Sequence, residues 1–208
     1  YANTVATIDF AKQFKGHGWV GIRYQIEPDE DYNEIVIHIR FKETDVKLQQ
    51  ETLGILGVNL IYGAFYKYND SKKLLRYLYD HLDKDQLEID TINFSGPRFA
   101  DVDNRLMSLQ LVKNGMTDAV MFNPEGKNIL PAAILYKKNI LALRGSFRPV
   151  TSVNIDMFKK SYELFIQENK VDKENTLVVS EITLSNLRSE GEIDERDFMD
   201  RAELLCSL

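Results

Sequence analysis

The sequence predicts an α+β fold in which a sheet is covered by helices, with an α/β fold as the alternative. The first 44 residues alternate apolar and polar side chains with the two-residue period of β-strands, and turn-like breaks separate the runs. From Leu87 onwards, short apolar runs alternate with segments of helical periodicity. Strands joined by short turns must be antiparallel, which favours α+β.

Three strands are expected in the N-terminal meander, over Thr4–Phe10, Trp19–Ile26 and Glu34–Phe41. One face of the third strand collects its large apolar residues, which are Ile35, Ile37, Ile39 and Phe41. This face is expected to contact the core.

A long helix is expected next, from Asp45 to about Tyr66, followed by a second helix over Ser71–His81. Apolar residues fall on two faces of the long helix, so we expect it to be buried on most sides. Its three glycines each cost about 1 kcal/mol relative to alanine, and close packing against another backbone would offset that cost. Asn59 is expected to satisfy a neighbouring backbone group, with a pocket-lining role as the alternative.

The rest of the chain mixes strands and helices. The expected elements are a strand over Leu87–Phe94, a helix from Asp101 to Asn114, buried strands over Asp118–Phe122 and Asn139–Leu143, a helix through Ile155 and Phe165, a strand over Leu177–Leu184 and an acidic helix from Asp194 to about Cys206. We expect the last helix to dock on its own domain, with exchange onto a second copy as the alternative. Residues 1–208 are expected to form a single domain, in which 1–44 is the meander and 45–208 the helix and strand core.

Composition narrows the class of protein. Apolar residues make up 44% and charged residues 28% of the chain, which is typical of a globular domain and not of a disordered one. No apolar run approaches the roughly 20 residues that a membrane-spanning helix needs, so no membrane partner is expected. The single cysteine, Cys206, cannot form an internal disulfide, which favours a cytoplasmic location. Because the chain opens on Tyr1 in a strand-like pattern, we expect it to be a piece of a longer protein.

The sequence shows no complete catalytic set and no metal site. The three histidines lack the spacing of metal ligands, and the residues around Cys206 are acidic, which disfavours a reactive thiolate. The net charge is −6, but Thr91–Lys160 carries ten Lys and Arg against five Asp and Glu, so the rest of the chain carries −11. A basic middle segment indicates an anionic ligand, whereas the acidic total argues against a nucleic-acid partner.

The first candidate binding segment lies between a buried strand and a helix start. Such a turn aims backbone N–H groups and the positive end of a helix at one point, which suits a phosphate. The residues expected to contact the ligand are Gly145, Ser146, Arg148, Thr151 and Asn154, with Arg144, Lys137 and Lys138 close by in sequence.

The second candidate segment is Phe94–Arg105. Arg98, in the Gly-Pro loop, is expected to contact the ligand, Arg105 could contact a phosphate, and Asp103 or Asp101 could bind a cation or ribose hydroxyls. The alternative is a capped helix start with one ion pair, because aspartate is favoured at helix starts.

At Gly145–Asn154 (GSFRPVTSVN) the chain resembles the first motif of the nucleotidyltransferases that include nicotinate-nucleotide adenylyltransferase. The resemblance implies that Thr151 and Asn154 occupy the two phosphate-contacting positions. Val153 and Asn154 stand where that family has glycine and histidine. Longer stretches (ETLGILGVNLIYGAFY, VDNRLMSLQLVKNGMTDAVMF and ILALRGSFRPVTSVNIDMF) are similar to a bacterial family that often carries the adenylyltransferase name without an established mechanism.

Three functions remain open from the sequence. The first is a domain that binds a nucleotide or another phosphorylated ligand. The second is a non-catalytic oligomerisation or interaction module, for which a homo-oligomer is the expected form. The third is a transferase that acts with an upstream portion of a longer chain.

Overall fold

The computed structural model describes residues 1–8, 14–189 and 191–207. Its contacts group the chain into two compact units, Tyr1–Met121 and Phe122–Leu208. The N-terminal strands share the first unit with the helices that follow them, so the meander is not a separate body. The expectation that residues 1–208 form a single domain remains a prediction.

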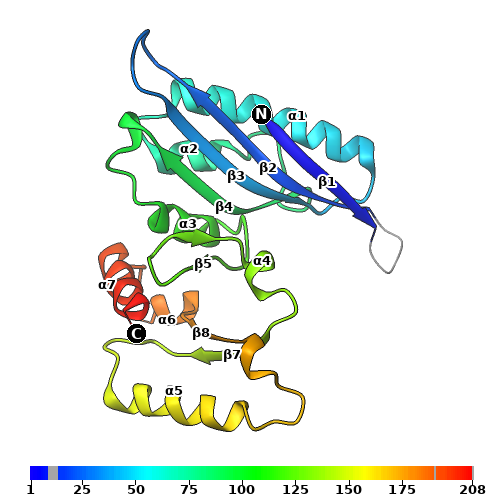
Figure 1. The fold of residues 1–208 in the computed structure, drawn as a ribbon. Helices are drawn as coiled ribbons and strands as arrows, with labels where there is room; N and C mark the ends of the chain where they lie inside the picture. The colour runs from blue at the N-terminus through cyan, green and yellow to red at the C-terminus, as the bar shows by residue number, and fades with distance from the viewer. Residues whose placement is uncertain (9–13, 190, 208) are drawn as a thin grey trace. The chain divides into compact units, whose positions relative to one another are not determined.

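The first unit is built on a four-stranded antiparallel sheet of order β1-β2-β3-β4 (Figure 1). Its strands are β1 (Ala2–Ile8), β2 (Phe14–Tyr24), β3 (Asn33–Phe41) and β4 (Leu87–Ser95). The antiparallel meander and the α+β class are therefore confirmed. Asp9 and Phe10, which the sequence places in the first strand, lie outside the described residues.

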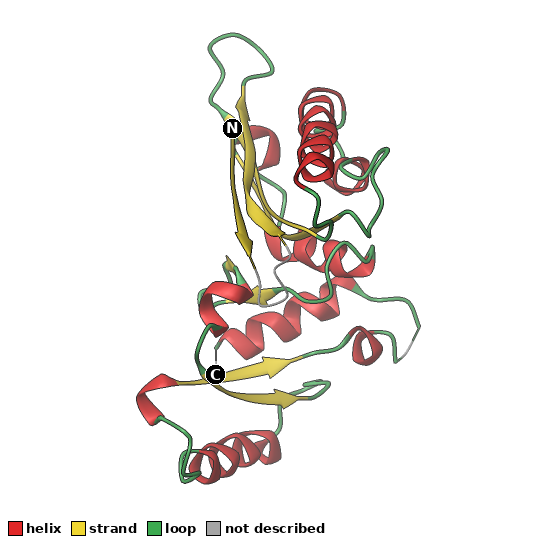
Figure 2. Ribbon diagram, turned by 90° about the vertical axis from the view of Figure 1, so that its right-hand side faces the viewer, coloured by secondary structure: helices red, strands yellow, loops and turns green. Residues whose placement is uncertain are grey.

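Two helices cover one face of this sheet, and Figure 2 shows the sheet nearly edge-on with the long helix on one side. The long helix α1 (Val46–Tyr66) begins after Asp45, whose carboxylate accepts hydrogen bonds from the N–H groups of Lys47 and Leu48. The second helix, α2 (Ser71–Tyr77), ends earlier than expected, and the backbone turns to a positive φ at His81.

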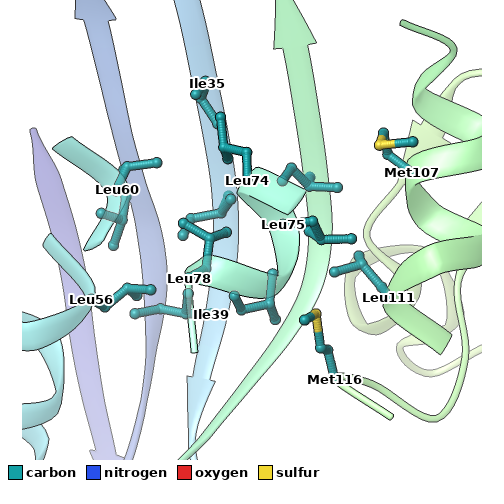
Figure 3. Close-up of a cluster of buried hydrophobic side chains, with 14 of the residues drawn as sticks. Ile35, Ile39, Leu56, Leu60, Leu74, Leu75, Leu78, Met107, Leu111 and Met116 are labelled. Atoms are coloured by element: carbon teal, nitrogen blue, oxygen red, sulfur yellow. The ribbon is translucent and has the colours of Figure 1, made fainter. Parts of the chain in front are cut away.

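The core of the first unit lies between the sheet and α1, α2 and α3 (Asn104–Lys113) (Figure 3). Each fully buried aliphatic side chain in it contributes about 1.5–3 kcal/mol. The largest fully buried side chains are Ile35, Ile37, Ile39, Leu56, Leu60, Leu74, Leu75, Leu78, Leu87, Ile89, Ile92 and Leu111. The third strand therefore turns its alternating isoleucines to the core, as its pattern predicts.

The helix expected from Asp101 begins later. Gly96, with φ of 104°, turns the chain into a short 3₁₀ helix, η1 (Pro97–Phe99), and Asp103 caps α3 by accepting the N–H of Arg105. Proline favours the first position of such a turn. The segment therefore forms η1 first, and α3 begins only at Asn104.

The second unit contains small elements. They are β5 (Met121–Phe122, which begins at the boundary), β6 (Asn128–Ile129), α4 (Pro131–Leu135), β7 (Asn139–Arg144), α5 (Ser152–Phe165), η2 (Lys173–Asn175), β8 (Thr176–Glu181), α6 (Leu184–Leu187) and α7 (Glu195–Cys206). Strands β7 and β8 pair in parallel. Helix α7 docks within this unit, where Phe198 contacts Phe122 and is buried.

Two strands predicted to be buried are only partly so. Residues 121–122 are half-buried, and along β7 exposed side chains such as Ile140 alternate with covered ones, of which Leu143 is buried. Both predictions of burial were wrong. The physical reason at β7 is that its described neighbours are β8 at one edge and α5, so one face of the strand stays open. Within the described residues, no helix has both the length and the apolar character needed to cross a bilayer.

Candidate functional site

The outward side of α1 carries apolar side chains in solvent. Its inward side packs Leu56, Leu60 and Ala64 into the core. On the opposite side, Val58 is 66% exposed and Ile61 is 53% exposed. The prediction that this helix is buried on most sides was therefore wrong, because α2 and the sheet cover only one side of it.

The exposed apolar residues form one stripe, which we call the α1 face and define as Gly54, Ile55, Val58, Ile61, Tyr62 and Phe65. Positions 54, 58, 61 and 65 follow the alternating four-and-three spacing that keeps side chains on one side of a helix. No charged residue occurs between Thr52 and Tyr66. The ring of Phe65 rests against Tyr24 of β2, with ring centroids 5.2 Å apart, which fixes this end of the stripe to the sheet.

The glycines of α1 fall into two classes. A Cβ added at Gly63 would lie 3.3 Å from Cγ of Leu74, so α2 requires a small residue there. An added Cβ at Gly54 or Gly57 would meet no atom within 4 Å among the described residues. The close packing expected against another backbone is thus not found: Gly63 packs against the side chain of Leu74, and Gly54 and Gly57 lie open.

Asn59 has the structural role expected of it. Its side-chain amide donates hydrogen bonds to the carbonyls of Leu78 and Asp80, with N···O distances of 3.1 and 2.7 Å. These bonds fix the chain segment after α2 to the middle of α1.

The C-terminal end of α1 is aromatic and basic. The Tyr62 ring lies 4.7 Å from that of Tyr66 and 5.0 Å from that of Tyr77, and Lys67 Nζ lies over Tyr62 and Tyr77 at 5.9 and 5.5 Å. A hollow of about 410 Å³ adjoins this cluster and is lined by Lys67, Lys73, Arg76, Tyr77, Tyr79 and Asp80. Lys73 is paired with Asp70 at 3.0 Å, so Lys67 and Arg76 against Asp80 leave this end with a small positive surplus.

The N-terminal end of α1 is acidic. Glu43 accepts a hydrogen bond from the Thr52 hydroxyl at 3.0 Å, and Asp45 caps the helix. A hollow of about 720 Å³ at this end is lined by Glu43, Tyr79, Leu82, Asp83, Lys84, Asp85 and Gln86. The apolar stripe therefore runs between ends of opposite charge.

The first predicted binding segment, Gly145–Asn154, lies between β7 and α5. Thr151 and Asn154 form a reciprocal cap, in which Thr151 Oγ1 accepts the N–H of Asn154 and Asn154 Oδ1 accepts the N–H of Thr151. The N–H of Gly145 donates to the Glu181 carbonyl, and the Ser146 carbonyl accepts a bond from buried Arg201. These particular polar groups of the four residues thus bond within their own unit.

The cations near this segment face protein partners. Arg144 makes two hydrogen bonds to Glu181, at 3.1 and 3.0 Å, and Arg148 Nε lies 2.9 Å from Asp197. Lys138 bonds Asn175, and Lys137 lies over the ring of Tyr136. Both guanidinium groups are therefore paired with carboxylates. The structure places the eight predicted residues in one unit, and their role in binding a ligand stays a prediction.

The second predicted segment belongs to the first unit. Arg98 pairs with Glu30, and Arg105 makes hydrogen bonds of 3.2 and 2.8 Å to the carboxylate of Asp103. The hydrogen bonds from Arg105 lower the pKa of Asp103 below its ordinary value. This arrangement matches the alternative of a capped helix start with an ion pair.

Sequence reasoning missed one buried polar pair. His38 Nδ1 lies 2.7 Å from Asp90 Oδ1, and both side chains are nearly inaccessible. The register of β3 and β4 shifts at this point, between His38 and Ile39. An aspartate within the apolar strand pattern of β4 was the available signal. Among the described residues, no three His, Cys, Asp or Glu side chains are grouped so that they could hold a metal ion.

The chain was compared with models of protein families, with curated proteins and with solved structures. None of the three comparisons found a match. The functional argument is therefore made from the geometry of the described residues.

Proposed function

We propose that this protein is an interaction module that binds a protein partner through the α1 face. The observation that carries the proposal is a helix that is apolar on both sides but covered on only one. Helices that are apolar all round are normally buried on all sides. The chain itself covers the inward side of α1, so a partner is the natural cover for the outward side.

The size of the exposed surface supports this proposal. Tyr62, Phe65 and Tyr66 are 42%, 41% and 72% exposed, which leaves about 300 Å² in water if each ring has about 200 Å². The aliphatic residues Leu48, Ile55, Val58 and Ile61 add about 200 Å² at about 100 Å² for each full side chain. Leu48 and Tyr66 flank the α1 face on the same helix, and together with it they give an exposed apolar area of roughly 500 Å². An area of this size is at the upper end for one patch on a monomer and is typical of an interaction site.

The form of the surface favours a protein over a small molecule. The α1 face is the convex side of a helix, and the two hollows lie at its ends and not on it. A small ligand needs a concave site that surrounds most of its surface. A groove or a second helix on a partner can instead bury a stripe of this length, about 18 Å for the 12 residues from Gly54 to Phe65.

The test uses thiol accessibility in cells. Val58→Cys and Leu164→Cys would each be made in a Cys206→Ser background, so that each protein has one thiol. Leu164 is a matched control, because its residue is as exposed as Val58 (66%) and it lies on another helix, outside Gly145–Asn154. In cells that express the gene natively, we expect N-ethylmaleimide to label the thiol at position 58 at least several-fold more slowly than the thiol at position 164. In dilute purified protein the two thiols should react at similar rates. Equal labelling rates in cells would reject the proposal.

Binding of a nucleotide or another phosphorylated ligand at Gly145–Asn154 is a second proposal. The exposed helix start of α5 supports it. The pairing of Arg144 and Arg148 with carboxylates gives it weaker support than the α1 face receives.

A further inference from the structure

We propose that the partner of the α1 face is a second copy of this chain, and that the two α1 helices pack antiparallel about a two-fold axis near Gly57 and Val58. This inference rests on the proposed function, because it names the occupant of the same surface. Its basis is the spacing of the stripe, the placement of the open glycines, the charge at the two ends and the exposed area.

The spacing along α1 is that of a helix pair. Glu51, Gly54, Val58, Ile61 and Phe65 follow one another at intervals of three, four, three and four residues. This repeat keeps a seam facing a partner helix that crosses at about 20°, with the helix axes about 8–10 Å apart. The described neighbours of α1 pack mainly on its other side, and only the Phe65 end of the seam contacts another element, through Tyr24 of β2.

The open glycines fit an antiparallel pair centred between Gly57 and Val58. In that register, Gly54 on the seam lies opposite Ile61 of the second copy, and Gly57, at the edge of the seam, lies at the level of its Val58. Each glycine then leaves space for a branched side chain from the other helix. This accounts for two glycines that no described part of the chain requires, at about 1 kcal/mol of helix stability each.

Charge selects the antiparallel orientation. One end of α1 is acidic through Glu43, Asp45 and Glu51, although Lys47 lies on the same end. The other end keeps a smaller positive surplus through Lys67 and Arg76 against Asp80, because Lys73 is paired with Asp70. An antiparallel pair about a two-fold axis brings each acidic end near a basic end, twice. A parallel pair would bring like charges together, which is unfavourable.

The exposed area is what a homodimer needs. A stable interface buries about 800 Å² on each partner. About 65% of a homodimer interface is apolar, which corresponds to roughly 500 Å². The exposed apolar surface of α1 estimated above reaches the same size when Leu48 and Tyr66 are counted with the α1 face.

The first experiment measures the oligomeric state of the full 208-residue chain by sedimentation velocity, at concentrations from about 1 to about 100 µM that span the range of weak dimers. We expect a dimer. Val58→Lys should weaken the dimer at least tenfold, because it places a charge in the centre of the seam, while Val153→Lys should leave the dimer intact. Circular dichroism would check that both variants keep the helical content of the parent.

Three outcomes separate the two proposals. If the parent chain is monomeric at the highest concentration, yet the thiol at position 58 is still protected in cells, the second-copy inference is overturned and the interaction module stands. If the parent chain is monomeric and the thiol at position 58 is not protected in cells, both the interaction module and the second-copy inference are rejected. A dimer that Val58→Lys does not weaken uses another surface, and this also overturns the inference.

The second experiment tests the orientation and does not depend on the lysine variant. In the Cys206→Ser background, Val58→Cys should form a disulfide-linked dimer on mild oxidation. Glu51→Cys alone should not, because the two copies of position 51 would lie about 20 Å apart along antiparallel helices, and a disulfide needs Cα atoms within about 7 Å. A mixture of Glu51→Cys and Phe65→Cys should cross-link. Efficient self-linking of Glu51→Cys would show a parallel pair and overturn the proposed arrangement.

Discussion

Buried polar contacts decide much of the energetics at the scale of single residues. The His38–Asp90 pair sits in the middle of the first sheet with almost no access to water. Trp19 and His17 lie against the His38 ring, with centroids 4.9 and 5.6 Å away. A polar group that loses its partner in such a place keeps the cost of its desolvation.

Asp90→Ala should therefore lower the free energy of unfolding by about 2–4 kcal/mol, because it leaves the His38 ring buried without its partner. Urea unfolding followed by circular dichroism measures this loss. Arg23→Ala is the control, because the Arg23–Glu34 pair is exposed and worth less than about 1 kcal/mol. Equal losses in the two variants would mean that the buried pair contributes no more than a surface contact.

The ligand hypothesis is also tested at single residues. If an anion binds at Gly145–Asn154, nucleotides and dinucleotides at millimolar concentration should raise the melting temperature of the parent chain, and Arg148→Ala should abolish the rise. Arg196→Ala is the matched control, because it removes an exposed arginine from the neighbouring helix α7. If the melting temperature does not shift, or shifts equally in the parent and in Arg148→Ala, the hypothesis that an anion binds at this loop is rejected.

At the scale of elements, α1 shows what apolar periodicity does and does not determine. The pattern correctly predicted a helix from Asp45 to Tyr66, because both its cap and its spacing are local properties. It did not predict which side is covered by the chain. Both sides of the helix are apolar, and a side that contacts a partner carries the same residues as a side that contacts the core.

The glycines of α1 give an element-scale prediction. In the Val58→Lys background, which we expect to be monomeric, Gly54→Ala should raise the free energy of unfolding by up to about 1 kcal/mol, because alanine favours the helix and meets no neighbour. In the parent chain the same substitution should weaken the dimer. Gly63→Ala should instead fail to stabilise the helix, because its Cβ would press on Leu74. Urea unfolding and sedimentation measure the two effects, and a Gly54→Ala variant that strengthens the dimer would contradict the proposed packing.

At the scale of the whole molecule, the sequence predicted the fold better than the site. Strand alternation correctly indicated β2 and β3, because the side-chain period is fixed by the pleat. The partners of charged residues cannot be predicted in this way. Arg144 pairs with Glu181, 37 positions away, and Arg148 pairs with Asp197. The net charge of a stretch of sequence therefore does not determine how charged side chains are grouped in the folded protein.

The basic segment Thr91–Lys160 illustrates the same limit. It crosses the boundary at Met121, so that Arg98 and Arg105 belong to one unit and Arg144 and Arg148 to the other. A surplus of positive charge that is continuous along the chain is thus divided between two bodies. The positive hollow at Lys67 and Arg76 lies outside this segment altogether, in a part of the chain whose net charge gave no signal.

Asp197 of α7 holds two guanidinium groups at once, those of Arg148 and Arg201. Arg201 in turn donates to the carbonyl of Ser146, in the loop before α5. An anion that bound Arg148 would compete with the carboxylate of Asp197. Its binding would therefore weaken the contact between helix α7 and this loop. Occupancy of the loop and docking of α7 are therefore thermodynamically linked, and each would report on the other.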